Sequence, residues 1–358
     1  MPRFEDQLFA GNDSLKVWET DRHVPQITID NEIIETTPVF DAYWYFAFER
    51  QNMFKRRIMG SNSLETSRDW ILATHRFTNA YRASDKVSQY LIRNVIWNEG
   101  SDWSDEDIFF RTLLFKLFNR IDTWEAISRE FGEIKLSTYN FSTFNEFLSS
   151  RQSDGIRNYS AAYIMPSAGR VFGYGPKHAN HLKLLEWMLE ERYPAKLSSF
   201  DSMADAFSLL LEAPSIGPFL GYQFVTDINY SSITNFSEME FVVAGPGALD
   251  GISKCFVDTK GVKPERIIKH MAQSQSYYFN HYEFEFFDLW GRPLQLIDCQ
   301  NVFCEISKYS RAAFPNIAGA SGRTRIKQKY KPTGRLSKPW YPPSWRLNKS
   351  IERDFAQV

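Results

Sequence analysis

The stretch at residues 209–251 constrains the fold more than any other part of the chain. Residues 209–213 read as the apolar end of a helix, residues 214–218 carry two prolines and a glycine, and apolar residues resume at 219–225. Proline is favoured at the first position of a helix, where its missing N–H costs no intrahelical hydrogen bond. The pattern therefore predicts two short helices joined by a tight turn.

The turn itself is a candidate phosphate-binding element. The first N–H groups of a helix have no intrahelical partner, and together with the helix dipole they favour a bound anion. Gly217 lets a ligand approach the backbone closely. We therefore expect Ser215, Ile216 and Gly217 to contact DNA. The alternative is an ordinary corner between two packed helices, which Gly and Pro also mark.

Helical periodicity dominates the rest of the chain. Apolar residues recur at spacings of three and four from Phe40 to Phe54, which predicts a helix with an aromatic side in the core. Ser104 followed by three acids predicts a capped helix start before the apolar run at 108–119. Further helices are expected at 124–131, 143–148, 178–190, 264–271 and 298–309. The fold class is therefore mainly α.

Two short stretches alternate as strands do. Residues 26–29 and 32–35 flank the turn pair Asp30-Asn31 and predict a small N-terminal hairpin. Residues 282–287 and 294–297 flank Trp290-Gly291, and they predict a second small β-hairpin near the C-terminus.

Composition excludes several classes of protein. No run approaches the roughly 20 apolar residues of a membrane span, and the first residues lack the apolar core of a signal peptide, so we expect a cytoplasmic protein. The three cysteines form no CxxC pair. His178 and His181 have no carboxylate or thiolate at a recognisable spacing, so neither a metal nor another cofactor is expected.

Positive charge is segregated toward one end of the chain. Residues 308–349 carry many lysines and arginines and no Asp or Glu. Such a segment suits a polyanion, and we predict that Arg323, Arg325 and Lys327 bind DNA. A solvated basic tail that only aids solubility is the alternative. The chain then divides into an N-terminal extension at 1–36, a helical domain at 37–310 with room for two lobes and a cleft, and a basic aromatic tail at 311–358.

A second set of cations falls at helical spacing. Arg76, Asn79 and Arg82 are three residues apart in a region, 70–96, with a helical pattern. One face would then present Arg76 and Arg82 to DNA phosphates. The commoner outcome is an ion pair between Arg82 and Asp85.

Six stretches together resemble a known family. They lie between Asp41 and Tyr309 and read YWYFAFERQNMF, RFTNAYRASDKVSQYLI, FFRTLLFKLFNR, IGPFLGYQFVTDINY, SEMEFVVAGPGALDG and DCQNVFCEISKY. They resemble the base-hypermodification branch of the helix-hairpin-helix DNA glycosylase superfamily, which includes alpha-glutamyl/putrescinyl thymine pyrophosphorylases and the helical domain of 5-hydroxymethyluracil DNA kinases. The resemblance implies a glycosylase-like helical fold acting on modified pyrimidines in DNA.

Two departures shape the predicted activity. The sequence contains no GxxxxGK[ST] loop for a nucleotide phosphate, which argues against a kinase. Pro218 and Phe219 occupy the place where bifunctional relatives carry an amine nucleophile, so strand cleavage is not expected. The main prediction is a monofunctional DNA glycosylase that flips out and excises a hypermodified, phage-type pyrimidine and leaves an abasic site, as in antiphage defence.

The resemblance also places candidate residues. Glu238, about twenty residues past Gly217, would stabilise the positive charge that develops on the sugar, with Asp227 as a second carboxylate and Glu240 as a third. Asn301, Glu305 and Lys308, with Tyr222 and Gln223, are candidates for binding the base. The structural alternatives are that Asp227 forms an ion pair, Glu240 is solvated, and Glu305 and Lys308 form a surface pair.

Two other functions remain open. One is a transferase that displaces pyrophosphate from an activated hydroxymethyluracil in DNA and joins an amino acid or polyamine to it. The other is a non-catalytic DNA-binding module. In every case the expected partner is DNA containing modified bases, with no membrane and no protein partner.

Overall fold

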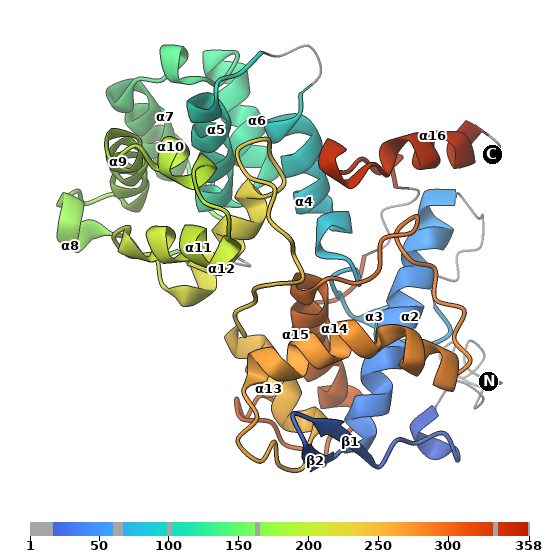
Figure 1. Cartoon of the computed structure of the whole chain (residues 1–358). Helices are drawn as coiled ribbons and strands as arrows, with labels where there is room; N and C mark the ends of the chain where they lie inside the picture. The colour runs from blue at the N-terminus through green and yellow to red at the C-terminus, as the bar shows by residue number, and fades with distance from the viewer. Residues whose placement is uncertain (1–16, 60–66, 99–101, 162–164, 332–335, 357–358) are drawn as a thin grey trace, which may run out of the picture. The chain divides into compact units, whose positions relative to one another are not determined.

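Helices form nearly all the regular structure in the computed structural model, which describes residues 17–59, 67–98, 102–161, 165–331 and 336–356 (Figure 1). The chain divides into two compact units. Unit 1 comprises Met1–Asp85, Glu238–Pro339 and Leu347–Val358, and unit 2 comprises Lys86–Ser237 and Trp340–Arg346. The mainly α fold class is confirmed.

Unit 1 is built around one buried helix, α15, which packs against α2, α13 and α14. Its elements are η2 (Val17–Glu19), β1 (Gln26–Ile29), β2 (Glu32–Glu35), α2 (Pro38–Met59), α3 (Trp70–Thr74), η3 (Arg82–Ser84), α13 (Pro246–Cys255), α14 (Pro264–His281), α15 (Leu296–Ala313) and α16 (Asn348–Ala356).

Aromatic side chains of α2 fill the core of unit 1, as its periodicity predicts. The Tyr43 and Phe303 ring centroids lie 4.6 Å apart, and Trp44 stacks on Tyr278 at 4.8 Å. Each of these rings is almost completely buried. Aromatic pairs at such distances add to the free energy gained from burial alone.

Helices α13 and α15 meet backbone to backbone. A Cβ atom built on Gly251 would lie 2.0 Å from the carbonyl oxygen of Phe303. Only glycine fits there, so Gly251 sets the distance between the two helices.

The N-terminal hairpin is confirmed. β1 and β2 pair antiparallel with Ile27 opposite Ile34. Asp30 and Asn31 connect them, and both have the positive φ angles, 50° and 68°, of a tight two-residue hairpin turn. The strands predicted near the C-terminus do not form. Residues 282–287 and 294–295 are irregular, the sole pairing is an isolated bridge between Leu289 and Arg292, and Leu296 already begins α15.

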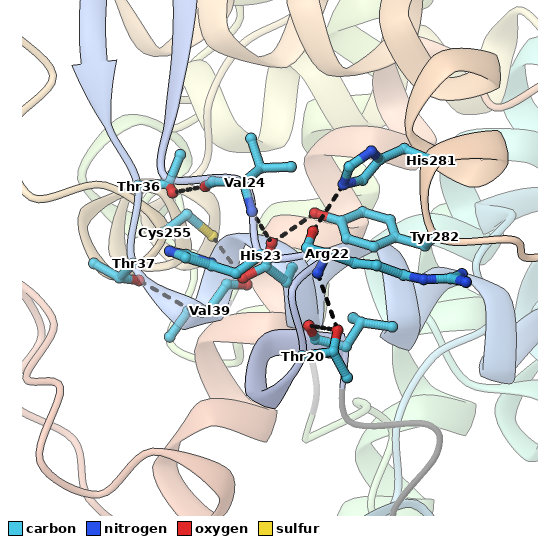
Figure 2. Close-up of polar contacts among 12 residues, drawn as sticks. Thr20, Arg22, His23, Val24, Thr36, Thr37, Val39, Cys255, His281 and Tyr282 are labelled. Atoms are coloured by element: carbon cyan, nitrogen blue, oxygen red, sulfur yellow. Dashed lines mark hydrogen bonds and ion pairs between the residues drawn. The ribbon is translucent and has the colours of Figure 1, made fainter.

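Residues 17–36 are tied into unit 1 by Asp41, which lies in the first turn of α2. Figure 2 shows two residues of this segment, His23 and Val24, close to Tyr282. One carboxylate oxygen accepts from the backbone N–H of Val24 at 3.0 Å and from the Tyr282 hydroxyl at 2.6 Å. The other lies 2.5 Å from His23 Nδ1. Burial raises the pKa of Asp41 despite these partners. The predicted extension is therefore an integral part of unit 1 over its described residues.

Residues 70–96 contain helices, as predicted, but the expectation that Arg76, Asn79 and Arg82 share one helix face is wrong. Between α3 and η3 the backbone donates to distant partners instead of to its own chain four residues back. Arg76 N–H donates to Gln328 O at 3.1 Å and Thr78 N–H to Glu305 at 3.2 Å. Arg76 and Arg82 consequently do not share a helix face.

Unit 2 is organised around α5, which contacts α6, α9, α10 and α12. Its elements are α4 (Lys86–Tyr90), the π-helix η4 (Leu91–Ile96), α5 (Asp105–Phe118), α6 (Ile121–Phe131), η5 (Leu136–Thr138), α7 (Phe141–Ser153), α8 (Gly169–Phe172), α9 (Lys177–Glu190), α10 (Tyr193–Ser198), α11 (Met203–Glu212), α12 (Pro218–Ile228) and η6 (Pro343–Trp345). Ser104 caps α5 as predicted, since its hydroxyl accepts from Asp107 N–H at 3.1 Å.

None of the helices in the described residues is long and apolar enough to cross a membrane. Residues 311–358, predicted as a tail, contribute to both units. Residues 340–346 belong to unit 2, and the described residues on either side belong to unit 1.

Replacing Gly251 by alanine should destabilise the protein by about 1–3 kcal/mol, because the new methyl group forces α13 away from α15. Urea denaturation measures the loss. Gly175→Ala is the control, since a Cβ there meets no atom within 4 Å. Equal stabilities of the two variants would contradict the close contact.

Candidate functional site

Three predicted base-binding residues meet in a polar cluster on one side of α15. We call this the α15 polar cluster, and it comprises Arg50, Thr78, Asn79, Asp85, Asn301, Glu305 and Lys308, all of unit 1.

Two residues of α15 in the cluster form hydrogen bonds with the irregular segment that precedes η3. Asn301 Nδ2 donates to Thr78 Oγ1 at 2.9 Å and to Asn79 O at 3.2 Å. Glu305 accepts from Thr78 N–H at 3.2 Å and pairs with Lys308 at 2.7 Å. The predicted pairing of Glu305 with Lys308 therefore occurs, but Glu305 is buried rather than on an open surface.

Arg50 of α2 completes the cluster from the other side. Its guanidinium is buried and donates to Thr78 O and to Asn79 Oδ1, both at 2.9 Å. Burial lowers its pKa, whereas the nearby carboxylates Asp85 and Glu305 raise it.

Asp85 is the group in this cluster best suited to exchange a proton near neutral pH. Its carboxylate accepts from Asn79 N–H at 2.8 Å. Desolvation raises the pKa of Asp85 to about 7, with a further rise from Glu305, against the lowering effects of the Asn79 hydrogen bond, Arg50 and Arg82. A carboxylic acid with that pKa can act as a general base or acid at physiological pH.

A second buried carboxylate lies at the start of α15. Asp298 accepts from Arg82 N–H at 2.8 Å and from Gln295 N–H at 3.0 Å, the latter as part of a capping box. Burial raises its pKa to about 7, and the charge of Glu238 raises it further, while Arg292 lowers it. Glu238 is buried and pairs with Arg292 at 3.0 Å. We call Glu238, Arg292 and Asp298 the carboxylate pair site.

The three predicted catalytic carboxylates have different surroundings. Glu238 belongs to unit 1 and lies in the carboxylate pair site. Asp227 belongs to unit 2, where it is fully buried and forms the predicted ion pair, with Lys116 at 3.2 Å. Glu240 is exposed. Within either unit, therefore, no two of the three share an ion pair or hydrogen-bond cluster among the described contacts.

The predicted hairpin in unit 2 is present. α11 and α12 pack together, and Gly221 lets Phe207 and Leu211 approach at 3.3 and 3.1 Å from an added Cβ. Ser215 has a left-handed φ of 66°, and Gly217 precedes the first turn of α12. Tyr222 and Gln223 lie on α12 and are buried. DNA binding at Ser215, Ile216 and Gly217 and base binding at Tyr222 and Gln223 stay predictions.

The predicted DNA-binding arginines and lysines of unit 1 divide by exposure. Arg76, Arg323, Arg325 and Lys327 are exposed. Arg82 is buried beside the carboxylate pair site. Its charge lowers the pKa of Asp85, and its backbone N–H donates to Asp298. DNA binding at these five positions stays a prediction.

The two histidines of α9 bond to neighbouring protein groups. His178 Nε2 lies 2.9 Å from Ser149 Oγ, and His181 lies 2.8 Å from the Tyr159 hydroxyl and 2.7 Å from Pro166 O. Burial lowers the pKa of His181 to about 4. No group of three or more His, Cys, Asp or Glu side chains among the described residues could hold a metal ion.

Sequence reasoning missed Arg50, Asp298 and Arg292 as site residues. Arg50 carried a usable signal, because it lies on a helix whose neighbouring positions are aromatic and buried. A charge in such a position requires specific partners. Asp298 and Arg292 carried no sign of a site, because Arg82 and Glu238, which they contact, lie far away in the sequence.

A family model described as the helical domain of 5-hmdU DNA kinase matches residues 37–319. The chain belongs to this family. It is 23% identical over 293 residues to a 5-hmdU DNA kinase of Bacillus phage SP10, and the match covers 76% of this chain and 45% of that relative. The chain thus spans less than half the length of the relative it matches. No solved structure matches it.

These comparisons support the base-hypermodification branch of the predicted resemblance and overturn the predicted DNA glycosylase. A kinase is a transferase that leaves the glycosidic bond intact, so the glycosidic hydrolase assignment, with its abasic product, was wrong. The geometry agrees, because Arg292 neutralises Glu238, the carboxylate expected to stabilise a sugar cation.

Asp85→Asn should flatten the dependence of stability on pH. The folded-state pKa of about 7 exceeds the unfolded value of 3.8, so the folded state holds its proton more tightly and loses stability as pH rises from about 4 to 7. Asparagine has no such proton and still accepts from Asn79 N–H. The free energy of unfolding, measured by urea denaturation between pH 4.5 and 7.5, should decline less for the variant than for the wild type. Titration of Asp298 accounts for part of the decline that remains in the variant. Asp21→Asn, at an exposed position, is the control. Parallel curves for wild type and Asp85→Asn would contradict the raised pKa.

Arg292→Gln should lower stability at pH 7 by about 2–4 kcal/mol, because it removes a cation from buried Glu238 beside Asp298. The loss should shrink at pH 5, where Asp298, with a pKa of about 7, is protonated and no longer repels Glu238. The matched control is Arg22→Gln, which breaks the more exposed pair with Glu283 and should cost less than about 1 kcal/mol. Equal losses in the two variants would show that the Glu238 pair has no special role.

Proposed function

We propose that this chain is a DNA-modifying transferase domain that binds a 5-hydroxymethylated pyrimidine in DNA and presents its 5-hydroxymethyl group for group transfer. The family match over residues 37–319 carries this proposal, because that span contains the α15 polar cluster and the carboxylate pair site. The relative's name, 5-hmdU DNA kinase, supplies the substrate class.

The chemistry of the sites suits such a transfer. When a hydroxyl or amine attacks, it must lose a proton, and a base works best with a pKa near the working pH. Asp85 and Asp298, both with a pKa of about 7, meet that condition. Lys308, half-buried beside Glu305, supplies positive charge that can stabilise a transferring phosphate.

We place the base at the α15 polar cluster. Asn301, Glu305 and Lys308 lie along one side of α15, and their amide, carboxylate and ammonium groups can hydrogen-bond to the edge of a pyrimidine. An exocyclic group inside a duplex is accessible once the nucleotide is flipped out, at a cost of a few kcal/mol.

Two transfers fit this site. The substrate is hydroxymethyluracil in one and pyrophosphorylated hydroxymethyluracil in the other. In the first, the hydroxymethyl oxygen attacks the terminal phosphorus of a nucleoside triphosphate, loses its proton to a carboxylate base and displaces the nucleoside diphosphate. In the second, an amine attacks the exocyclic carbon and displaces pyrophosphate. In both transfers Asp85 or Asp298, with a pKa of about 7, can accept the proton that the attacking group loses.

The test is nucleoside mass spectrometry of 5-hydroxymethyluracil DNA after incubation with the protein, ATP and Mg²⁺, and of pyrophosphorylated DNA after incubation with an amine donor. We expect a modified nucleoside with its base still attached to the sugar. Asn301→Ala should lower the yield about 10- to 100-fold through the loss of one or two hydrogen bonds at the site. Glu352→Gln, at an exposed position of α16, should match the wild type. Unchanged nucleosides in both reactions would refute the proposal.

A further inference from the structure

A row of exposed cations borders the α15 polar cluster. In residues 319–331, which we call the basic strap, every second residue from 323 onward is positively charged: Arg323, Arg325, Lys327, Lys329 and Lys331. All five are exposed, whereas Ile326 and Tyr330 between them are partly buried. Where such a segment is extended, alternate side chains project to one side about 6.6 Å apart.

Buried groups of α13 hold the beginning of the basic strap. Asp250 accepts from Ser321 N–H at 2.6 Å and also from the Ser307 hydroxyl. Burial raises the pKa of Asp250, but these hydrogen bonds and the charge of Lys254 lower it by more, so the pKa lies below its usual value. Gly319 lies so close that an added Cβ would be 2.5 Å from Asp250 Oδ1. The strap is therefore fixed to α13 at a stably charged carboxylate.

Backbone pairing holds the other end of the strap. Lys329 forms an antiparallel bridge with His75, in which Arg76 N–H donates to Gln328 O at 3.1 Å and Tyr330 N–H donates to Thr74 O at 2.9 Å. In the middle, Arg311 of α15 donates to Arg325 O at 3.3 Å. These anchors use the backbone of the strap, which leaves its charged side chains available for a ligand.

The cations of the strap repel other positive groups of unit 1. The pKa of His75 is lowered by burial and further by Lys329 and Lys308. The pKa of Arg311 is lowered by burial and further by Arg323, against the opposing effects of Asp250 and Glu305. Among the described residues, no acid pairs with the side chains of Arg323, Arg325 or Lys327. A surface of this kind attracts a polyanion.

The strap also reaches the α15 polar cluster. Tyr330 lies close enough to Arg50 to affect its pKa, and Lys329 and Lys308 both act on His75. An anionic chain lying along the strap would therefore pass beside the residues to which we assign the base.

We propose that the basic strap binds the phosphates of the DNA strand that carries the target base, with Arg323, Arg325 and Lys327 as the principal contacts. This inference rests on the proposed function for its choice of DNA. The strap contributes affinity that is independent of sequence, and the α15 polar cluster contributes the choice of base.

The test is the salt dependence of binding to a fluorescein-labelled oligonucleotide without modified bases. Each phosphate contact contributes about 0.7–0.9 to the magnitude of the slope of log K against log salt concentration. The magnitude of this slope should therefore be smaller by about 2–3 in the triple variant Arg323→Gln, Arg325→Gln, Lys327→Gln than in the wild type. Its thermal unfolding should match the wild type, because the strap is held by its backbone. The control, Lys260→Gln, Lys263→Gln, Lys349→Gln, removes three exposed cations of unit 1 outside the strap and should keep the wild-type slope.

The outcomes separate this inference from the proposed function. An unchanged slope in the strap variant, or equal losses in the strap and control variants, would overturn the strap as the phosphate site. Tighter binding of RNA than of DNA of the same sequence would overturn the assignment to DNA. A reduced slope together with no modified nucleoside from the wild type would support the strap and refute the transferase.

Discussion

The backbone contact between α13 and α15 is the constraint on which unit 1 depends. Because Gly251 has no side chain, the carbonyl of Phe303 lies directly against α13. This contact fixes the helix that carries Asp298, Asn301 and Glu305, and it brings Asp250 of α13 beside Ser307 of α15. The anchor of the basic strap follows from that close approach, and α15, which it holds, carries residues of both the α15 polar cluster and the carboxylate pair site.

Buried aspartates repeatedly hold irregular segments on these helices. Asp41 of α2 accepts from Val24 N–H, Asp298 of α15 from Arg82 N–H, and Asp250 of α13 from Ser321 N–H. Each supplies an acceptor to a backbone N–H that has no helix or sheet partner. Burial raises the pKa of Asp41 and Asp298, whereas hydrogen bonds and Lys254 keep that of Asp250 low. The same kind of hydrogen bond therefore involves Asp298, which can titrate near pH 7 in the candidate site, and Asp250, which stays charged outside it.

The failed glycosylase prediction shows why fold and chemistry have to be argued separately. The sequence stretches that suggested it lie within the matched family, so they reported the fold branch correctly. The activity inferred from them rested on the hairpin, the missing amine nucleophile and Glu238 as the carboxylate that stabilises the sugar cation. Pairing with Arg292 changes that role, and the same scaffold can host different reactions at its sites.

The sequence by itself determined the helices, the cap at Ser104, the N-terminal hairpin and the turn before α12, because these follow from apolar spacing and turn residues within a few positions. It also placed Asn301, Glu305 and Lys308 on one side of a helix. Only the tertiary structure decided that residues 75–81 are not helical, that 282–297 form no hairpin, and that Asp85 and Asp298 titrate near pH 7. The physical reason is range: helix periodicity is local, whereas the hydrogen-bond partners, burial and charges that set a pKa come from residues as far as 227 positions away.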